Sequence, residues 1–199
     1  MIFALALLLP IGVYGVIWAR SRAGQPDGTR PSARGMAGVF FAIPALYLAW
    51  DNADAAPKTQ VFFIVMQWLW LPLVIQDYMA KAVTVVGLAV VTAASIAATW
   101  ALLGLTIAAV VQAATVVALF GAIHILYRRY RGRDPFGMGD YPVLAVLPLT
   151  LAPAALGPWI MIASLLGLAQ AWGLSRRLSG SVAMIPLLYL SWQFCVTVG

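Results

Sequence analysis

The sequence predicts an all-α, polytopic membrane protein: a single domain over residues 1–199 with about eight transmembrane helices. Its 199 residues are 63% hydrophobic and only 9% charged, whereas a soluble domain is about 45–50% apolar and about 25% charged. Apolar runs long enough to cross a bilayer, which takes roughly 20 residues, follow one another along the whole chain. No polar stretch is long enough for a second, extramembrane domain.

The apolar runs are expected to be helices, because backbone groups in lipid must be hydrogen-bonded within their own segment. The first run begins without a basic leader, so we interpret it as a retained helix rather than a cleaved signal peptide. The second and sixth runs are short, and three prolines should kink the sixth. The runs cover residues 2–19, 36–50, 59–77, 82–103, 106–127, 141–156, 158–174 and 182–198.

The basic residues predict the topology. The loops after the first, third, fifth and seventh runs hold all 12 Lys and Arg residues except Lys58. Because basic loops stay in the cytoplasm, we expect both termini outside it and a multi-pass protein of the cytoplasmic membrane. This distribution explains the net charge of +6, so no nucleic-acid partner is expected.

The sequence predicts neither a metal site nor a cofactor. It holds one cysteine, Cys195 in the last apolar run, and one histidine, His124. These form no disulfide framework and no cysteine-rich zinc site. We expect Cys195 to be a packing residue and His124 to be a packed or interfacial one.

The candidate catalytic residues are two of the six acidic residues, all of which are aspartates. On the predicted topology, Asp77 ends the third run and Asp140 begins the sixth, both at the cytoplasmic edge, while Asp51 and Asp54 fall on the other side. An ionisable residue at membrane depth is a functional-site hypothesis by default. Each has a structural alternative: Asp77 could pair with Lys81 four residues on, and Asp140 could cap a helix.

Two carboxyl groups brought together in a poorly solvated site can share one proton. One can then activate water as a general base while the other donates a proton to a scissile carbonyl. Such chemistry requires no metal. The sequence places Asp77 and Asp140 at one membrane face but does not show that they meet.

The residues before Asp140 are Gly137, Met138 and Gly139, which give the pattern GxGD at the mouth of a predicted helix. Glycine permits positive φ and close backbone approach, so a substrate could lie extended along this loop. Gln76, beside Asp77, is the candidate polar neighbour of the pair. The other glutamines of the apolar runs, Gln67 and Gln112, are expected to bond between helices.

This pattern resembles the type IV prepilin peptidases and their archaeal relatives, the preflagellin peptidases, which are GxGD intramembrane aspartic proteases. The chain reads FGMGDYPVLAVLPLTLAPAALGPW around Asp140. The turn at 156–159 and the Ile185-Pro186 element are similar to family features. Asp77 precedes Asp140 by 63 positions, a separation similar to that of the two family aspartates. The likeness runs from the second helix to the end of the chain.

The resemblance implies an aspartic-type endopeptidase that removes the basic leader of a prepilin-like precursor (a type IV pilin, pseudopilin or flagellin-like protein) at the cytoplasmic face. That membrane-protein substrate and lipid would be its partners. Two residues depart from the family pattern, Pro142 in place of a lysine and Thr84 in place of a proline. The loop 20–35 lacks the cysteine pairs of the family's methyltransferase module, so N-methylation is not expected.

Three alternatives stay open. A presenilin-like protease shares GxGD but has Tyr-Asp where this chain has Gln76-Asp77. An inactive homologue could act in pilus assembly. A small membrane transporter could also use intramembrane aspartates, although both candidates lie at one face and no inverted repeat is visible. The sequence predicts no particular oligomeric state.

Overall fold

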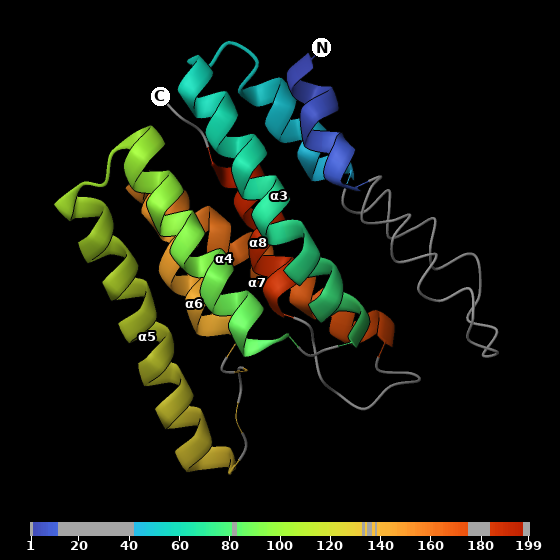
Figure 1. Cartoon of the computed structure of the whole chain (residues 1–199). Coiled ribbons are helices and arrows are strands. Elements are labelled where there is room, and N and C mark those ends of the chain that lie inside the picture. The colour runs from blue at the N-terminus through green and yellow to red at the C-terminus, as the bar shows by residue number, and fades with distance from the viewer. Residues whose placement is uncertain are drawn as a thin grey trace.

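The structure is a computed structural model that describes residues 2–11, 42–80, 83–132, 134, 137, 139–174 and 184–196. Over these residues the chain forms eight α-helices and no strand (Figure 1). Two short helices cover Ile2–Ile11 and 42–51. The longer part comprises α3 (Pro57–Ala80), α4 (Val85–Ala98), a π-helical turn (Thr99–Leu103), α5 (Ile107–Arg131), α6 (Asp140–Val146), two 3-10 turns (Leu147–Thr150 and Pro153–Ala155), α7 (Leu156–Leu174) and α8 (Met184–Cys195).

Four segments are long and apolar enough to cross a membrane: Pro57–Asp77, Val85–Leu103, Ile107–Arg131 and Pro153–Gln170. Large apolar side chains on their outer faces are exposed, for example Val85 at 81%, Ile107 at 84% and Leu168 at 65%. Such faces are stable only against lipid or another apolar surface. The all-α class expected from the sequence is confirmed, and these helices support a membrane protein.

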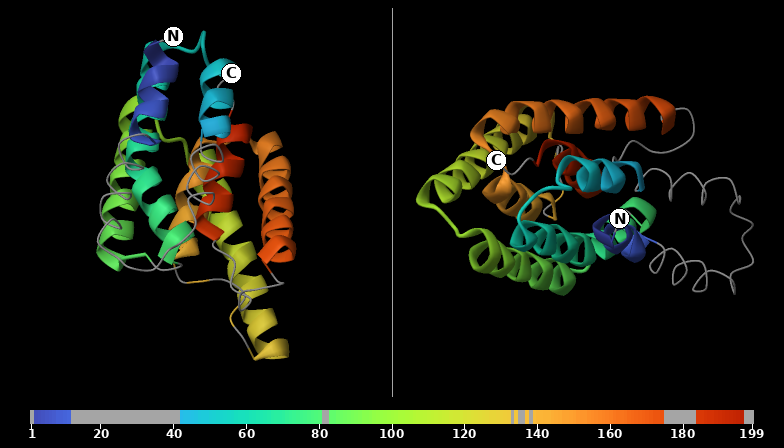
Figure 2. Two further views of the ribbon diagram at one scale, coloured as in Figure 1. Left: turned by 90° about the vertical axis from the view of Figure 1, so that its right-hand side faces the viewer. Right: turned by 90° about the horizontal axis from the view of Figure 1, so that it is seen from above.

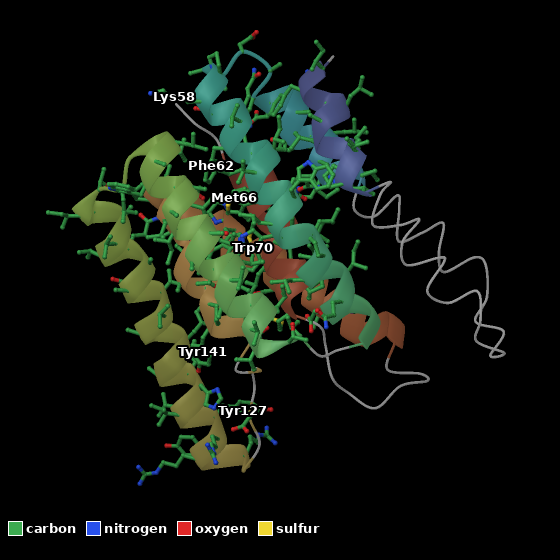
Figure 3. The ribbon with its side chains drawn as sticks, viewed as in Figure 1. Lys58, Phe62, Met66, Trp70, Tyr127 and Tyr141 are labelled. Carbon is green, nitrogen blue, oxygen red and sulfur yellow. The ribbon has the colours of Figure 1, made fainter. Side chains whose placement is uncertain are left out.

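The centre of the bundle is formed by α3 and α8, with the other helices around them (Figure 2). Phe62, Met66 and Trp70 follow one another at four-residue spacing and are buried on one face of α3 (Figure 3), as helical periodicity requires. In α8 every residue from Ile185 to Cys195 except one is buried. The two helices pack through aromatic rings, since Tyr189 stacks on Trp70 at a centroid distance of 6.3 Å.

Buried polar side chains join these central helices. Gln67 of α3 accepts hydrogen bonds from the Tyr189 hydroxyl at 2.7 Å and from Nε2 of Gln193 at 2.6 Å. Trp70 Nε1 donates to the Ser95 hydroxyl of α4 at 2.9 Å. In an apolar environment such bonds hold helices in a fixed relation, which confirms the role expected for Gln67.

The sixth apolar run corrects the sequence prediction, because it is not one kinked helix over 141–156. The α-helix ends at Val146, the chain is extended at Leu151 and Ala152, and α7 begins at Leu156. Pro148 and Pro153 lack the N–H groups that a continuing helix needs, and Ala152 has the extended backbone that is preferred before a proline. The break leaves carbonyl groups without helical partners.

Gln112 of α5 satisfies two of these carbonyl groups. Its Nε2 donates to the oxygen of Pro148 and to that of Leu151, both at 2.9 Å. This confirms the expectation that Gln112 bonds between helices. The bonds hold the broken segment against α5, so the path from α6 to α7 is set by both the prolines and this one side chain.

The two ends of the bundle differ. The start of the first helix and the end of α8 lie at one end, and the end of α3 and the start of α6 lie at the other (Figure 1). Among the basic residues that the structure describes, Arg128, Arg129 and Arg131 occupy the last turn of α5 at the second end, while Lys58 stands at the first (Figure 3). The remaining basic loops fall outside the described residues.

Candidate active site

The end of α3 and the start of α6 bring Asp77 and Asp140 to the same end of the bundle. Both aspartates are buried, with 9% and 7% of their surface exposed. Two buried carboxyl groups are unusual in any protein and more costly beside lipid. No described basic residue forms an ion pair with either carboxyl group. Lys81, the alternative partner for Asp77, lies outside the described residues.

Asp140 and Gly137 close a short turn with two hydrogen bonds. The Asp140 amide donates to the Gly137 carbonyl at 3.1 Å, and the Gly137 amide donates to Oδ2 of Asp140 at 2.9 Å. Asp140 is the first residue of α6, and Gly139 holds the capping position. The capping interpretation of Asp140 is therefore wrong, and its carboxyl group instead stands in the first turn and bonds back to the loop.

Asp77 meets the beginning of α8. The backbone amide of Ile185 interacts with its carboxyl group, and Ile185 is the second residue of that helix. The first four amides of a helix have no partner within it, so this one is free to orient the carboxylate. Oδ2 of Asp77 is buried and has no hydrogen-bond partner among the described residues.

The two aspartates lie close enough to affect each other. Burial raises the pKa of the Asp140 carboxyl to about 6, the Gly137 amide opposes this rise, and the charge of Asp77 adds to it. Asp140 is the first residue of α6 and stands outside the four long apolar segments. The convergence of residues 63 positions apart, which the sequence left open, is therefore present in the fold.

Gly139 lies close to side chains of α4 and α8. A Cβ atom added there would lie 3.7 Å from Leu88 of α4 and 3.8 Å from Ile185 of α8. Neither glycine uses the positive φ that glycine permits: Gly139 has φ −69°, and of the described glycines only Gly104 and Gly132 have positive φ. Gly139 instead leaves room for the neighbouring side chains, and Gly137 provides the amide that holds Asp140.

The other predicted site residues are placed less tightly. Gln76 is half-buried, and its side chain has no hydrogen bond to another described residue. Met138 lies outside the described residues. Asp51 and Asp54 are exposed near the start of α3, at the end opposite Asp77, so the structure separates them from the pair.

Pro142 and Thr84, which differ from the prepilin peptidase pattern, both fit the local backbone without strain. Pro142 is in the first turn of α6, where a missing N–H removes no helical hydrogen bond. Thr84 precedes α4 with φ −69°, a value that proline also adopts. Neither substitution therefore disturbs the backbone that carries the aspartates.

Sequence reasoning missed two contacts, one at Asp77 and one beside the loop before Asp140. The amide of Ile185 gave no signal beyond the Ile-Pro element. His124 was expected to be a packed or interfacial residue, and no partner was named for it. Its Nε2 lies 3.3 Å from Oδ1 of Asp134, and its ring lies 5.9 Å from that of Tyr141, the residue after Asp140. Arg128 shares the Asp134 carboxylate at 3.5 Å. These contacts tie the loop before Asp140 to α5.

Over the described residues, no group of three or more His, Cys, Asp or Glu side chains could hold a metal ion. Comparison with known proteins finds no matching protein-family model, no matching curated protein and no matching solved structure.

Proposed function

We propose that this protein is an intramembrane aspartic endopeptidase that removes the basic leader of prepilin-like precursors at the cytoplasmic membrane face. The observation that carries the proposal is the approach of two buried carboxyl groups, Asp77 and Asp140, which no described cation neutralises. Carboxyl groups so placed share one proton. A purely structural role gives no reason to bury two carboxyl groups at one end of the bundle with no described cation beside them.

The reaction uses the shared proton in two steps. Burial and the charge of Asp77 raise the pKa of Asp140, so we place the proton there. A water molecule attacks the scissile carbonyl carbon, Asp77 takes a proton from it, and Asp140 donates its proton to the carbonyl oxygen. When the tetrahedral intermediate collapses, Asp77 returns its proton to the amide nitrogen as the C–N bond breaks, and Asp140 recovers its proton from the hydroxyl group.

Neighbouring backbone groups hold the pair ready for this exchange. The Ile185 amide orients Asp77, and the Gly137 amide holds Oδ2 of Asp140 at 2.9 Å. Oδ2 of Asp77 has no hydrogen-bond partner among the described residues, and we assign it to the attacking water. The substrate's extended segment would lie beside the 137–139 loop, and its apolar helix would lie in lipid. A cut at this end of the bundle matches the junction between a leader and a membrane helix.

The test is cleavage of a purified prepilin in reconstituted vesicles, followed by gel electrophoresis. We expect wild type to remove the leader and Asp77→Asn and Asp140→Asn each to lower the rate by about 10²–10⁴-fold, the usual contribution of acid–base groups. Asp54→Asn, an exposed aspartate at the opposite end, is the matched control and should cleave normally. Normal cleavage by Asp77→Asn would overturn the assignment of the pair.

The same preparation separates the alternatives. A wild-type protein that binds the precursor without cutting it favours the inactive homologue that acts in pilus assembly. A protein that neither binds nor cuts leaves the small transporter, for which solute uptake into the vesicles is the direct assay.

A further inference from the structure

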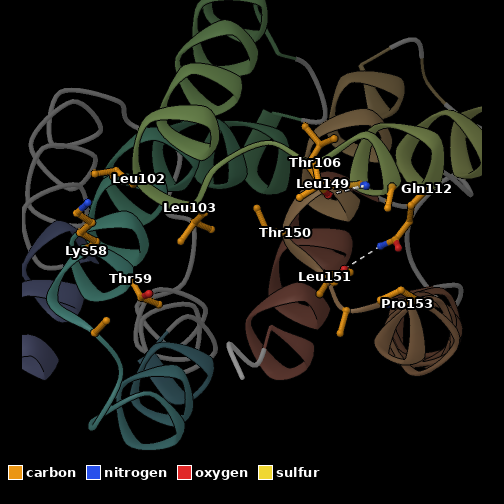
Figure 4. A pocket seen from close by; sticks show the side chains of 14 residues that line it. Lys58, Thr59, Leu102, Leu103, Thr106, Gln112, Leu149, Thr150, Leu151 and Pro153 are labelled. Carbon is orange, nitrogen blue, oxygen red and sulfur yellow. Dashed lines mark hydrogen bonds between the residues drawn. The ribbon is translucent and has the colours of Figure 1, made fainter.

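A second feature of the bundle lies far from the aspartates. A partly open pocket of about 500 Å³ is formed by the start of α3, the π-helical turn after α4, the start of α5 and the broken segment after α6 (Figure 4). Its volume is in the range of small-molecule sites, roughly 300–1,000 Å³. Lys58, on its rim, lies about 28 Å from Asp77 along α3 at 1.5 Å per residue.

The pocket combines an apolar wall with one positive charge. Leu102, Leu103, Leu149 and Leu151 supply the apolar side, and Lys58 is the one charged side chain among the described residues that line it. Lys58 is exposed and forms no ion pair with a described carboxylate. Its charge is therefore available to a ligand.

Topology does not account for this lysine. It is the one basic residue that the sequence places opposite the basic loops, so it does not serve as an anchor on the cytoplasmic side. The start of α5 adds to its field, because a helix begins with the positive end of its dipole. Thr106 caps that helix by accepting a hydrogen bond from the Ala109 amide at 3.2 Å, and both residues line the pocket.

We propose that this pocket binds one anionic phospholipid of the leaflet at the Lys58 end, with the phosphate at Lys58 and an acyl chain against the leucines. Lys58 is the second residue of a long apolar segment, so it stands at the depth of lipid head groups. Lysine places its charge at that depth while its methylene stem runs along apolar surface. Ile107, between the lining residues Thr106 and Ala108, exposes a large apolar side chain, as expected where this end of the bundle faces lipid.

The experiment is native mass spectrometry of the purified protein from mixed micelles that contain phosphatidylglycerol or phosphatidylcholine with the same acyl chains. We expect wild type to retain one phosphatidylglycerol molecule in preference to phosphatidylcholine. Lys58→Gln should lower that retention about fivefold, the effect of one basic residue near an anionic lipid. Ala108→Phe, which keeps the charge and fills the exposed rim of the pocket, should lower retention of the lipid as well.

Arg131→Gln is the matched control, because it removes one positive charge at the other end of the bundle and should leave retention unchanged. Equal retention by Lys58→Gln and wild type, or equal losses in Lys58→Gln and Arg131→Gln, would overturn the proposal. Displacement of the lipid by glycerol phosphate, which has the charge without the chain, would show a site for soluble phosphate and overturn the lipid assignment. Retention unaffected by Ala108→Phe would place the lipid elsewhere.

Discussion

Replacing Asp140 by asparagine should stabilise the protein at neutral pH while it removes peptidase activity. Burial raises the pKa of this carboxyl from 3.8 to about 6. Above that pH the folded state holds a buried charge, which has a lower free energy in the solvated unfolded state. Asparagine has nearly the same shape, carries no charge, and its side-chain oxygen accepts the Gly137 amide bond as the carboxylate does.

The size of the effect follows from the shift. Between pH 3.8 and 6 the folded protein binds more protons at Asp140 than the unfolded chain does, so the free energy of unfolding falls as pH rises through this window. Two pKa units at 1.36 kcal/mol each correspond to about 3 kcal/mol at neutral pH. This is an upper limit, because an unfolded chain in detergent keeps part of its burial.

The assay is thermal unfolding in detergent at two pH values. A chain of about 200 residues shifts in Tm by about 2–4 °C per kcal/mol, so Asp140→Asn should raise Tm by several degrees at pH about 7.5. The gain should vanish near pH about 4, where wild-type Asp140 is protonated. Asp54→Asn, exposed at the other end, should stay within about 0.5 kcal/mol of wild type at both pH values.

A fall in Tm for Asp140→Asn at neutral pH would refute this reasoning. It would mean that the carboxylate is stabilised by an ion pair or cap and is a structural residue. A rise in Tm together with loss of cleavage is the pattern of a functional group kept at the expense of stability.

Three further substitutions test the contacts that hold the site. Gln67→Leu should lower the free energy of unfolding by about 1–3 kcal/mol, because Tyr189 and Gln193 lose their acceptor; an unchanged denaturant midpoint would refute this. Gln112→Leu should lower the free energy of unfolding by a similar amount, since two carbonyl groups at the break lose their donor. The measurement is a fall in Tm, and a Tm equal to wild type would contradict this prediction. Gly139→Ala should fold normally, as its Cβ makes ordinary contacts at 3.7 and 3.8 Å, whereas Gly139→Leu should displace the neighbouring helices and abolish cleavage. Loss of folding in the alanine variant would show that glycine is needed for another reason.

The hydrophobic runs predicted most helices within a few residues of their observed ends, as α3 and α5 show. Their length and continuity are set by hydropathy, which local sequence carries directly. The sixth run failed because Pro148 and Pro153 ended the helix rather than kinking it. A proline can do either, and the outcome depends on whether a neighbour such as Gln112 satisfies the freed carbonyl groups.

The candidate pair was also predicted only in part. The sequence singled out Asp77 and Asp140 because acidic residues are few and the predicted topology put these two at one face. Their approach depends on α8, whose first turn supplies the Ile185 amide, and no local pattern indicates that contact. Of the two properties of glycine that the sequence analysis named, Gly139 does not use positive φ, since it has ordinary helical backbone; it does lie close to neighbouring helices.

By itself the sequence determined the all-α class, the apolar character of the long helices and the short list of carboxyl groups, because each depends on composition and on periodicity along the chain. Only the tertiary structure decided which groups meet: Asp140 with the Gly137 amide and the charge of Asp77, Gln112 with the broken segment, and Lys58 with a pocket at the opposite end. Apart from the local contact of Asp140 with Gly137, these relations join residues far apart in the chain. Their energies depend on burial and distance, which the order of residues does not specify.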